Sequence, residues 1–375
     1  MPPSKTCLII AQSGRALATS ARMAGLVPYV IDRFADQDTL ALALNCVVVS
    51  GNDSGFNAGE LLEKLATCLD IPLHGVIYSS GLENHYDVLN FLDQHWTLFG
   101  NDAAVVKACK EPGLFFPVLS RLGIPHPRTC VNVSQIVRQG KNWIIKKIGA
   151  SGGGHIRALG KGALITQDVY FQEKLSGRSL SVVFLANALN VTLVGMNELW
   201  TVAPEKYDFR YAGAVTRLNL PVSITRLLED IVTMLARELG LRGLCGMDVI
   251  VDDNGQCFVL EVNPRPTATF ELHQTELGLC GPHILACEGR LISLPHHADF
   301  LRAHQVQYAD REFIMPEIIW PDWASDRPRP GRHIKVNDPV CIVHAQATCM
   351  NDIETLLQQR STILMQRMGL QKLAA

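Results

Sequence analysis

The stretch Met247–Pro266, MDVIVDDNGQCFVLEVNPRP, decides the fold predicted for this chain. Two runs rich in β-branched and aromatic residues flank Asn254-Gly255, and Asn-Gly between such runs is the strongest short-range signal for a two-residue hairpin turn. A hairpin folded about this dipeptide places Asp248 directly opposite Glu261. Like charges in directly opposed positions destabilise a sheet, so this pairing calls for a cation between them.

The two faces of the predicted hairpin differ in character. Side chains alternate between the faces of a strand, so Asn263 shares a face with Glu261. Two carboxylates and an amide oxygen are hard ligands suited to Mg²⁺ or Mn²⁺. Two solvated carboxylates on an exposed face are the alternative, and the nearby Arg265 favours the metal site. The other face is expected to pack on a core through Met247, Val249, Phe258, Leu260 and Val262.

A glycine-rich loop lies upstream of the hairpin. The run Trp143–Lys147, WIIKK, is typical of a strand that ends in lysines, and small residues follow it. Their backbone N–H groups can approach phosphate oxygens, and Lys146 supplies a cation. On its own this loop also describes a flexible turn, and no GK[ST] follows as in a Walker A loop. The predicted phosphate cradle consists of Ser151, Gly152, Gly153 and Gly154.

Length and composition limit the classes of function that this chain can have. A chain of 375 residues is long enough for two or three domains, and 47% hydrophobic with 19% charged residues is typical of an ordinary soluble protein. A net charge of −2 gives no reason to expect nucleic acid or an anionic membrane as partner. The N-terminal apolar run is too short for a signal peptide or membrane span. Eleven cysteines without a CxxC pair predict reduced thiols and a cytoplasmic location. The adjacent pair His296-His297 is expected in a surface turn.

The first hundred residues predict a parallel sheet. Strand, turn, helix and strand follow one another within about thirty residues, as in a βαβ unit. Ser13-Gly14, at the end of the first strand, could bind an anion or form a tight turn. The missing GxGxxG argues against a dinucleotide-binding dehydrogenase. Further expected elements are the strands Thr6–Ala11, Pro28–Asp32, Asn45–Ser50, His74–Gly81, Asp168–Lys174 and Leu180–Asn187, the helices Asn101–Cys109 and Ile224–Leu239, and a terminal strand and helix.

Three motifs in this order resemble the ATP-grasp superfamily of carboxylate–amine ligases. They are WIIKKIGASGGG, YFQEKLSGRSLSV and GMDVIVDDNGQCFVLEVNPRP. The N-terminal AQSGRALATSARMAGLVPYVIDRFADQDT and the C-terminal RPRPGRHIKVNDPVCIV are similar to a narrower group, which includes the tyramine–glutamate ligase of methanofuran biosynthesis and relatives linked to pterin-dependent one-carbon metabolism. The resemblance implies an α/β ATP-grasp fold over residues 98–290. It implies an N-terminal doubly wound domain over 1–97 and a C-terminal α/β extension over 291–375.

The resemblance also implies how ATP would be bound. Lys146 would contact the α- and β-phosphates, and Lys107 would be an earlier nucleotide lysine. The backbone of Glu173 and Leu175 would bracket adenine. One departure concerns Ser179, which stands where an acidic residue often contacts the ribose.

For the metal and the chemistry, the resemblance implies that Asp248, Glu261 and Asn263 hold two Mg²⁺ ions. Arg265 would stabilise an acyl phosphate, with Lys146 as the second catalytic cation. Two further departures are Lys147, where a proline is usual, and Gly246, where D-alanine ligases carry a catalytic arginine. Arg265 or, as a weaker candidate, Arg242 would have to compensate.

The predicted function is therefore an ADP-forming ligase that joins an activated carboxylate to an amine. Glutamate is the favoured acid and a small tyramine-like amine the favoured acceptor, and a homodimer is compatible with the resemblance. A bicarbonate-activating carboxylase shares every nucleotide feature, and a non-catalytic nucleotide-binding regulator is a further alternative. Candidate substrate contacts, each of which could equally be a surface charge, are Arg15, Glu83, Arg210 and Glu271.

Overall fold

A computed structural model describes most of the chain. It covers residues 5–52, 54–132, 134, 136, 142–160, 166–202, 209–216, 220–295 and 300–370. The histidine pair at 296 and 297 lies outside these residues. Within them, every helix is too short or too polar to cross a bilayer.

The N-terminal region forms the parallel sheet that the sequence predicts. Its strand order is β3-β2-β1-β6-β7, and every pairing between neighbours is parallel. The last strand of this sheet, β7, comes directly after residue 97. The elements are β1 Thr6–Ile10, α1 Arg15–Met23, β2 Val27–Asp32, α2 Gln37–Leu42, β3 Asn45–Val48, β4 Gly51–Asn52, β5 Gly55–Phe56, α3 Ala58–Ala66, β6 Gly75–Tyr78, α4 Tyr86–His95 and β7 Leu98–Phe99.

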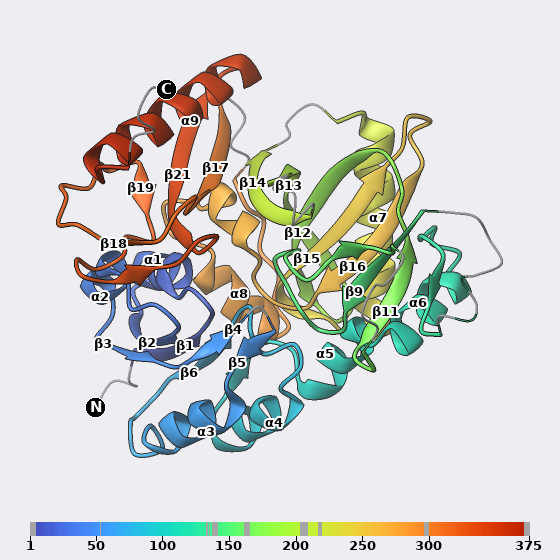
Figure 1. Cartoon of the computed structure of the whole chain (residues 1–375). Coiled ribbons are helices and arrows are strands. Elements are labelled where there is room, and N and C mark those ends of the chain that lie inside the picture. Colours follow the sequence, from blue (N-terminus) through green and yellow to red (C-terminus); the bar gives the residue numbers. More distant parts are fainter. Residues whose placement is uncertain are drawn as a thin grey trace.

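Alternating side chains of β1 explain why helices cover both faces of this sheet. Cys7 and Ile9 pack with the apolar side of α1, whereas Leu8 and Ile10 pack with α3 and α4 on the opposite face. All four residues are fully buried. A strand buried on both faces reads as a continuous apolar run, as CLII does here. The result is a doubly wound layer structure (Figure 1).

A helical pair and a small antiparallel sheet follow. The four strands have the order β10-β9-β11-β8, and β9 carries the lysine-ended WIIKK run. In Figure 1 this sheet lies beside α6, on the side of the molecule away from the N-terminal sheet. The elements are α5 Ala103–Lys110, α6 Pro112–Arg121, β8 Thr129–Cys130, β9 Trp143–Lys147, β10 Arg157–Ala158 and β11 Val169–Glu173.

The largest sheet spans the centre of the molecule and the C-terminal extension. Its order is β16-β15-β12-β13-β14-β17-β21-β19, so strands after residue 300 continue the sheet that contains the hairpin. The elements are β12 Arg178–Asn187, β13 Val191–Val202, β14 Arg210–Thr216, α7 Val222–Leu239, β15 Arg242–Val251, β16 Cys257–Asn263, the 3₁₀ helix η2 Ala268–His273, α8 Cys280–Cys287, β17 Leu301–Tyr308, β18 Phe313–Ile314, β19 Ala324–Ser325, β20 His333–Ile334, β21 Pro339–Ala347 and α9 Met350–Arg367.

The two faces of this sheet have different environments. One face is apolar and is covered by α7 at the hairpin end and by α9 at the other end. Helix α7 is amphipathic and ends at Gly240, whose left-handed conformation (φ 72°) terminates the helix. Along the other face a row of polar residues runs through direct pairings from Asp248 to Ser181, Asn197 and Thr216. Because η2 packs over β12, β13 and β14 on this face, Ser181, Asn197 and Thr216 are buried, whereas Asp248 at the hairpin end is half-buried.

Candidate active site

Strands β15 and β16 bring the predicted acidic pair together. Asp248 pairs directly with Glu261, as the sequence predicts. The turn between the strands is different, because Asp252 both accepts from the N–H of Gly255 at 3.0 Å and donates to the carbonyl of Gln256 at 3.0 Å. The loop therefore has three residues instead of two. It ends at Gly255 with φ +79°, the left-handed position that such loops require.

A β-bulge in β16 compensates for the longer loop. Val249 pairs with Val259, whereas Asp248 pairs with Glu261, so Leu260 is the extra residue. The loop takes one more residue from the β15 side than predicted, and the bulge adds one residue to β16, so the two shifts in pairing cancel. The predicted pairing of the acids is consequently correct, although the predicted turn is wrong.

Because of the loop and the bulge, some of the residues that face the core differ from those predicted. Phe258 and Leu260 were expected in the core but are only half-buried, and Leu260 instead lines a pocket beside the acids. Cys257 and Val259 take their places in the apolar cluster, because the register shift exchanges the two faces near the turn. The remaining predicted core residues lie in that cluster as expected: Met247, Val249 and Val262.

Asn263 and an unpredicted lysine complete the polar face. The amide Nδ2 of Asn263 donates to Asp248 Oδ2 at 3.3 Å and to Glu261 Oε1 at 3.4 Å. The Lys110 ammonium donates to Asn263 Oδ1 at 2.6 Å and to Glu261 Oε2 at 3.1 Å. The side chains of Asp248, Glu261 and Asn263 therefore converge, and the ammonium of Lys110 is already bound to two of them.

Lys110, and not Lys107, is the lysine of α5 that reaches this site. Lys107 is exposed, and its Nζ lies 6.0 Å from the centre of the Tyr86 ring. Lys110 is 7% exposed and shares the buried face of α5 with Val106 and Cys109. Val106, Cys109 and Lys110 share one face of the helix by their spacing, and this pattern indicates that Lys110 points inward.

The charges of the acidic pair are strongly unequal. Burial raises the pKa of Asp248, and the adjacent Glu261 carboxylate raises it further, to about 7. Burial acts on Glu261 in the same direction, but the ammonium groups of Lys110 and Lys146 outweigh it and lower the pKa of Glu261. Asp248 is therefore only partly ionised near neutral pH. A divalent ion binds deprotonated ligands, so its binding displaces the remaining proton to solvent.

Lys146 lies at the end of β9 within a pocket next to the hairpin. It is 6% exposed, and its Nζ is 3.5 Å from Gln172 Oε1 and 5.6 Å from the centre of the Tyr170 ring. Burial would lower the pKa of Lys146, but Tyr170 and Glu261 outweigh it and raise that pKa. The ammonium is therefore held as a buried cation. The pocket is lined by Cys109, Lys110, Pro112, Phe115, Phe116, Lys146, Lys147, Gly149, Ala150, His155, Tyr170, Leu260 and Glu261.

His155 in this pocket escaped the sequence analysis. Burial lowers its pKa to about 4, and the positive charge of Lys146 acts in the same direction. Its Nδ1 is buried without a hydrogen-bond partner among the described residues. The position of His155 directly after the SGGG run was the available signal.

The glycine loop lies beside the pocket with a conformation that side chains would prevent. Gly152 and Gly153 both have φ +75°. A Cβ on Gly153 would lie 1.9 Å from the backbone oxygen of Phe209, and the Gly152 carbonyl accepts from the N–H of Tyr211 at 2.9 Å. The loop therefore packs against the start of β14, and its predicted neighbours Ser151 and Gly154 are half-buried.

Arg265 is fixed by an acid from the N-terminal domain. Its Nε donates to Glu83 Oε1 at 2.7 Å, and its Nη2 lies 3.5 Å from Asn263 Oδ1. Arg265 and Glu83 are 7% and 4% exposed. Burial acts to raise the pKa of Glu83, but Arg265 and Lys110 outweigh it and lower that pKa. Glu83, which the sequence predicted as a candidate substrate contact, is thus the partner that orients Arg265.

Other sequence candidates lie away from this cluster. Glu173 ends β11, its N–H donates to Arg128 O at 2.8 Å, and neither Glu173 nor Leu175 lines the pocket. Arg242 is exposed at the start of β15. Arg210 stacks 3.8 Å from the centre of the Tyr308 ring and donates to the carbonyl of Asn337 at 2.8 Å, in the C-terminal extension.

The departures from the ATP-grasp pattern have local explanations. A Cβ on Gly246 would lie 2.5 Å from Thr267 Cγ2, so Thr267 fills the space that a longer side chain would need. Lys147 forms an ion pair with Asp168 at 3.1 Å near the surface. Ser179 pairs with Ile250 and is half-buried.

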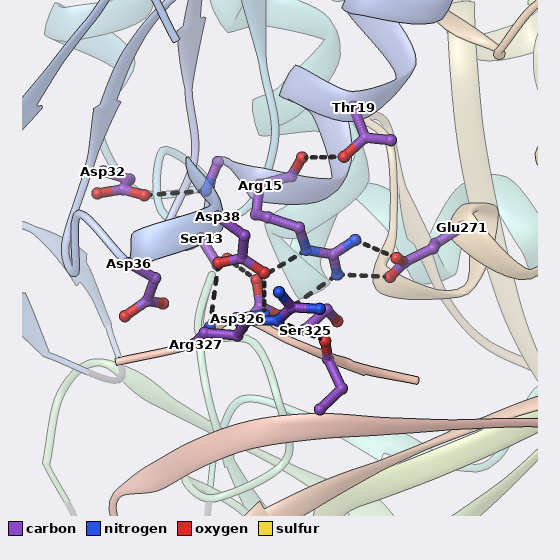
Figure 2. Close-up of polar contacts among 12 residues, drawn as sticks. Ser13, Arg15, Thr19, Asp32, Asp36, Asp38, Glu271, Ser325, Asp326 and Arg327 are labelled. Atoms are coloured by element: carbon purple, nitrogen blue, oxygen red, sulfur yellow. Dashed lines mark hydrogen bonds and ion pairs between the residues drawn. The ribbon is translucent and has the colours of Figure 1, made fainter. Parts of the chain in front are cut away.

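A second polar cluster lies where three regions of the chain meet. The Arg15 guanidinium, at the start of α1, binds both carboxylate oxygens of Glu271 on η2, and its Nε donates to Asp326 Oδ1 at 3.1 Å (Figure 2). Asp326 also accepts from the Ser13 hydroxyl at 2.9 Å, and Asp32 accepts from the N–H of Gly14 at 3.2 Å. The predicted anion position at the start of α1 is therefore occupied by carboxylates of the chain itself.

Two histidines adjoin this cluster. His304 on β17 and His344 on β21 are directly paired across the strands. Burial lowers the pKa of His344, and it lowers the pKa of His304 to about 4, so both imidazoles are neutral. Burial acts to raise the pKa of Glu271, but the Arg15 guanidinium outweighs it through its charge and its hydrogen bonds and lowers that pKa to about 2. The cluster thus combines one carboxylate with two neutral imidazoles.

Comparison with known proteins agrees with this geometry. Residues 113–269 match the family model of the ATP-grasp domain. The chain has the ATP-grasp fold. The matched segment contains the glycine loop, Lys146 and the metal-type hairpin, and Lys110 precedes it by three residues.

Curated relatives of this ATP-grasp domain include D-alanine–D-alanine ligases. The ligase of Bordetella avium (strain 197N) is 32% identical over 108 residues, which cover 27% of this chain and 33% of that protein. The ligase of Nitratidesulfovibrio vulgaris (strain DP4) is 35% identical over 96 residues, covering 24% and 31%. The chain thus spans about a third of the length of these curated relatives.

Solved structures share the ATP-grasp fold over nearly the whole chain. The biotin carboxylase domain of 2-oxoglutarate carboxylase from Hydrogenobacter thermophilus superposes with a TM-score of 0.75 at 13% identity, covering 93% of this chain and 87% of that one. An L-amino acid ligase from Bacillus licheniformis gives 0.69 at 12% identity, covering 96% and 98%. At such identities the likeness establishes the fold alone.

Proposed function

We propose that this protein is an ADP-forming ligase that activates a carboxylate with ATP and joins it to an amine. One observation carries the proposal. Asp248, Glu261 and Asn263 converge with Lys110 and Lys146, beside a glycine loop within an ATP-grasp fold. This is a set of groups that can hold a metal–triphosphate complex, since Mg²⁺ bound by few carboxylates completes its shell with phosphate oxygens.

The donor set of the hairpin fits a hard divalent ion. Two carboxylates and an amide oxygen suit Mg²⁺ or Mn²⁺, and no sulfur or imidazole is among the three donors. Bound there, the ion would supply charge neutralisation at the phosphates. The Lys110 ammonium contacts Glu261 and Asn263. Once a metal ion neutralises the acids, this ammonium can bind a phosphate oxygen instead.

Each cation of the site has a separate role in this proposal. Lys146 binds the α- and β-phosphates, and Lys110 takes the role that the sequence assigned to Lys107. Arg265, oriented by Glu83, stabilises the acyl phosphate. Preorganised cations of this kind stabilise charge that develops during phosphoryl transfer.

The remaining nucleotide contacts are proposed from the family resemblance. The backbone at Glu173 and Leu175 brackets adenine, and Ser151, Gly152, Gly153 and Gly154 cover the phosphates. The close packing of Gly153 on Phe209 supports a loop whose backbone, free of side chains, can lie near phosphate oxygens.

The chemistry needs no nucleophilic side chain. A carboxylate oxygen of the substrate attacks the γ-phosphorus, and the bond to ADP breaks. The amine then attacks the acyl carbon, loses a proton, and inorganic phosphate leaves as the amide forms. The protein aligns the reactants and neutralises charge, which is the task that Lys146 and Arg265 can perform.

For the substrates, we propose an amino acid, glutamate first, as the acid and a small tyramine-like amine as the acceptor. The D-alanine–D-alanine ligase and L-amino acid ligase likenesses support an amino acid substrate. The narrower resemblance supports a role in methanofuran or pterin-linked cofactor biosynthesis, and the eleven cysteines without a CxxC pair support a cytoplasmic location.

Bicarbonate activation is the second candidate, favoured by the likeness to the biotin carboxylase domain. A phosphate-release screen of amino acids against amines, with mass spectrometry of the product, separates the two. A ligase needs both an acid and an amine for ADP formation. Bicarbonate-dependent release that ignores the amine would support the carboxylase.

Two variants test the site itself. Glu261→Gln and Lys146→Ala are expected to abolish ATP turnover while far-UV circular dichroism stays unchanged. Near-normal turnover by either variant would show that the assigned site is wrong.

A further inference from the structure

Three metal-type ligands meet outside the nucleotide site. His304 and His344 come from neighbouring strands of the C-terminal extension, and Glu271 comes from η2. One donor atom from each side chain can be chosen such that all three lie within 4.8 Å of one another. Donors at this spacing need only small side-chain movements to share one ion.

One of these donors is buried without a partner. His304 is 0% exposed, and its Nε2 shares a hydrogen bond of 2.5 Å with the Tyr211 hydroxyl. Its Nδ1 is buried and has no hydrogen-bond partner among the described residues. Buried polar atoms are normally satisfied, so this nitrogen calls for a ligand.

The surroundings of the three donors resemble the outer shell of a metal site. The Tyr211 hydroxyl holds Nε2 of His304 and leaves Nδ1 for an ion. The Ser325 hydroxyl is 2.6 Å from Nε2 of His344, the nitrogen that lies 3.9 Å from Glu271 Oε1, so an ion bound there would replace that contact. Arg15 Nη2 donates to Glu271 Oε2 at 2.8 Å and keeps the carboxylate ionised and oriented. Ligating side chains are typically fixed by such second hydrogen bonds.

The local charge also favours a cation. Glu271 and Asp326 both pair with the single guanidinium of Arg15, so in the described residues two carboxylates face one cation at this point. A divalent ion would offset the remaining negative charge.

We propose that Glu271, His304 and His344 bind a divalent transition ion of the zinc class. Two imidazoles and a carboxylate suit Zn²⁺ and its neighbours and do not suit Mg²⁺, so this site differs in chemistry from the oxygen site of the hairpin. The ion ties η2 to β17 and β21. Because η2 follows Arg265 by only a few residues, the ion fixes the C-terminal extension against the segment that leaves the active site.

The test uses full-length protein without a histidine tag. Protein is equilibrated with Zn²⁺ at a buffered free concentration, and bound metal is measured by elemental mass spectrometry. Wild type is expected to hold one zinc per chain. His344→Gln, at a partly exposed position, is expected to lower the affinity on the order of 10-fold or more. Co²⁺ in place of Zn²⁺ is expected to give d–d absorption that the variant lacks.

Two matched variants locate the metal. His333→Gln removes an exposed histidine of the same extension, which contacts Glu312, and is expected to retain the zinc. Glu261→Gln removes a hairpin ligand and is also expected to retain it. The proposal is overturned if wild type binds no zinc, if His344→Gln binds it equally, or if Glu261→Gln loses it. None of these outcomes bears on ligase activity, so the two proposals stand or fall separately.

Discussion

Single buried charges determine the site, and their partners come from distant parts of the chain. Glu83 lies 182 residues from Arg265, and Lys110 lies 151 residues from Glu261. Pairs of this kind are costly to break, because removing one partner leaves the other charge buried and uncompensated. Two predictions at this scale concern them.

The first compares two lysines of the same helix. Lys110→Ala is expected to lower kcat/KM for ATP on the order of 100-fold, because it removes a cation aimed at the phosphates. Lys107→Ala serves as the matched control and is expected to stay within about twofold, since an exposed charge is screened by solvent. Steady-state kinetics at saturating Mg²⁺ measure both. Equal losses in the two variants would contradict the proposed assignment.

The second concerns the acid that orients Arg265. Glu83→Gln keeps the shape but removes the charge, and is expected to destabilise the fold by about 3 kcal/mol. It is also expected to lower kcat more than it raises KM for ATP, because Arg265 acts on the acyl phosphate in this proposal. Urea unfolding and kinetics provide the two readouts. Unchanged stability would contradict a buried ion pair between these residues.

Sequence reasoning located Asp248, Glu261, Asn263, Lys146 and Arg265 but not the partners Lys110 and Glu83. The hairpin residues follow from strand alternation, which is a local rule. Lys110 and Glu83 reach the site through tertiary packing, and although helical spacing indicates that Lys110 points inward, no local pattern specifies which residues it or Glu83 contacts. His155 was likewise missed, since a histidine after a glycine run has many explanations.

At the scale of elements, the hairpin shows how a correct pairing arose from an incorrect turn. Asn254-Gly255 indicated a two-residue turn, but the loop has three residues and Leu260 bulges. The longer loop shifts the strand pairing by one residue between the turn and the bulge. The bulge reverses that shift, so the pairing from Glu261 onward is the predicted one. For this reason the acids pair as predicted, whereas Phe258 exchanges its core position with its neighbours.

The glycine loop supplies a prediction at the same scale. Gly152→Ala and Gly153→Ala place a Cβ at the same φ of +75°, at a cost of about 1 kcal/mol or more each. Only at Gly153 does the Cβ also meet backbone, at Phe209, whereas the space around Gly152 is open. Gly153→Ala is therefore expected to weaken ADP binding about 10-fold more than Gly152→Ala, as measured by calorimetry. Equal affinities would show that the contact with Phe209 does not position the loop.

At the scale of the whole molecule, the C-terminal extension is an integral part of the central sheet. β17 pairs with β14 across a long sequence separation, so the terminal strand joins a sheet begun much earlier and the terminal helix packs on it. Local patterns predict elements, but they carry no information about which edge a strand joins. The domain division at residue 290 therefore separates regions of sequence that share one sheet.

The extension also contacts the N-terminal domain through an acidic interface. Asp36 accepts from Arg332 at 3.1 Å, and Asp38 accepts from the backbone N–H groups of Asp326 and Arg327 at 2.8 and 3.0 Å. Figure 2 shows Asp32, Asp36 and Asp38 gathered near Asp326. Carboxylates held this close resist ionisation, so the interface is sensitive to pH.

The last prediction follows from Asp36. Burial raises its pKa to about 8, Asp326 adds to the effect, and Arg332 opposes it without cancelling it. Between the unfolded pKa near 4 and the folded value, the native state holds a proton that the unfolded state lacks. The free energy of unfolding therefore falls as pH rises through this window, by up to about 1.4 kcal/mol per pH unit from this group. Asp36→Asn cannot release a proton and is expected to reduce that loss.

Urea unfolding of wild type and Asp36→Asn between pH 5 and 8.5 measures the difference in slope. Asp93→Asn, on the exposed side of α4, is the control and is expected to keep the wild-type slope. If Asp36 were ionised in the folded protein through its pair with Arg332, Asp36→Asn would instead lower stability equally at every pH in this range. The two outcomes differ in pH dependence and not merely in size, so the experiment decides whether burial or the arginine dominates at this interface.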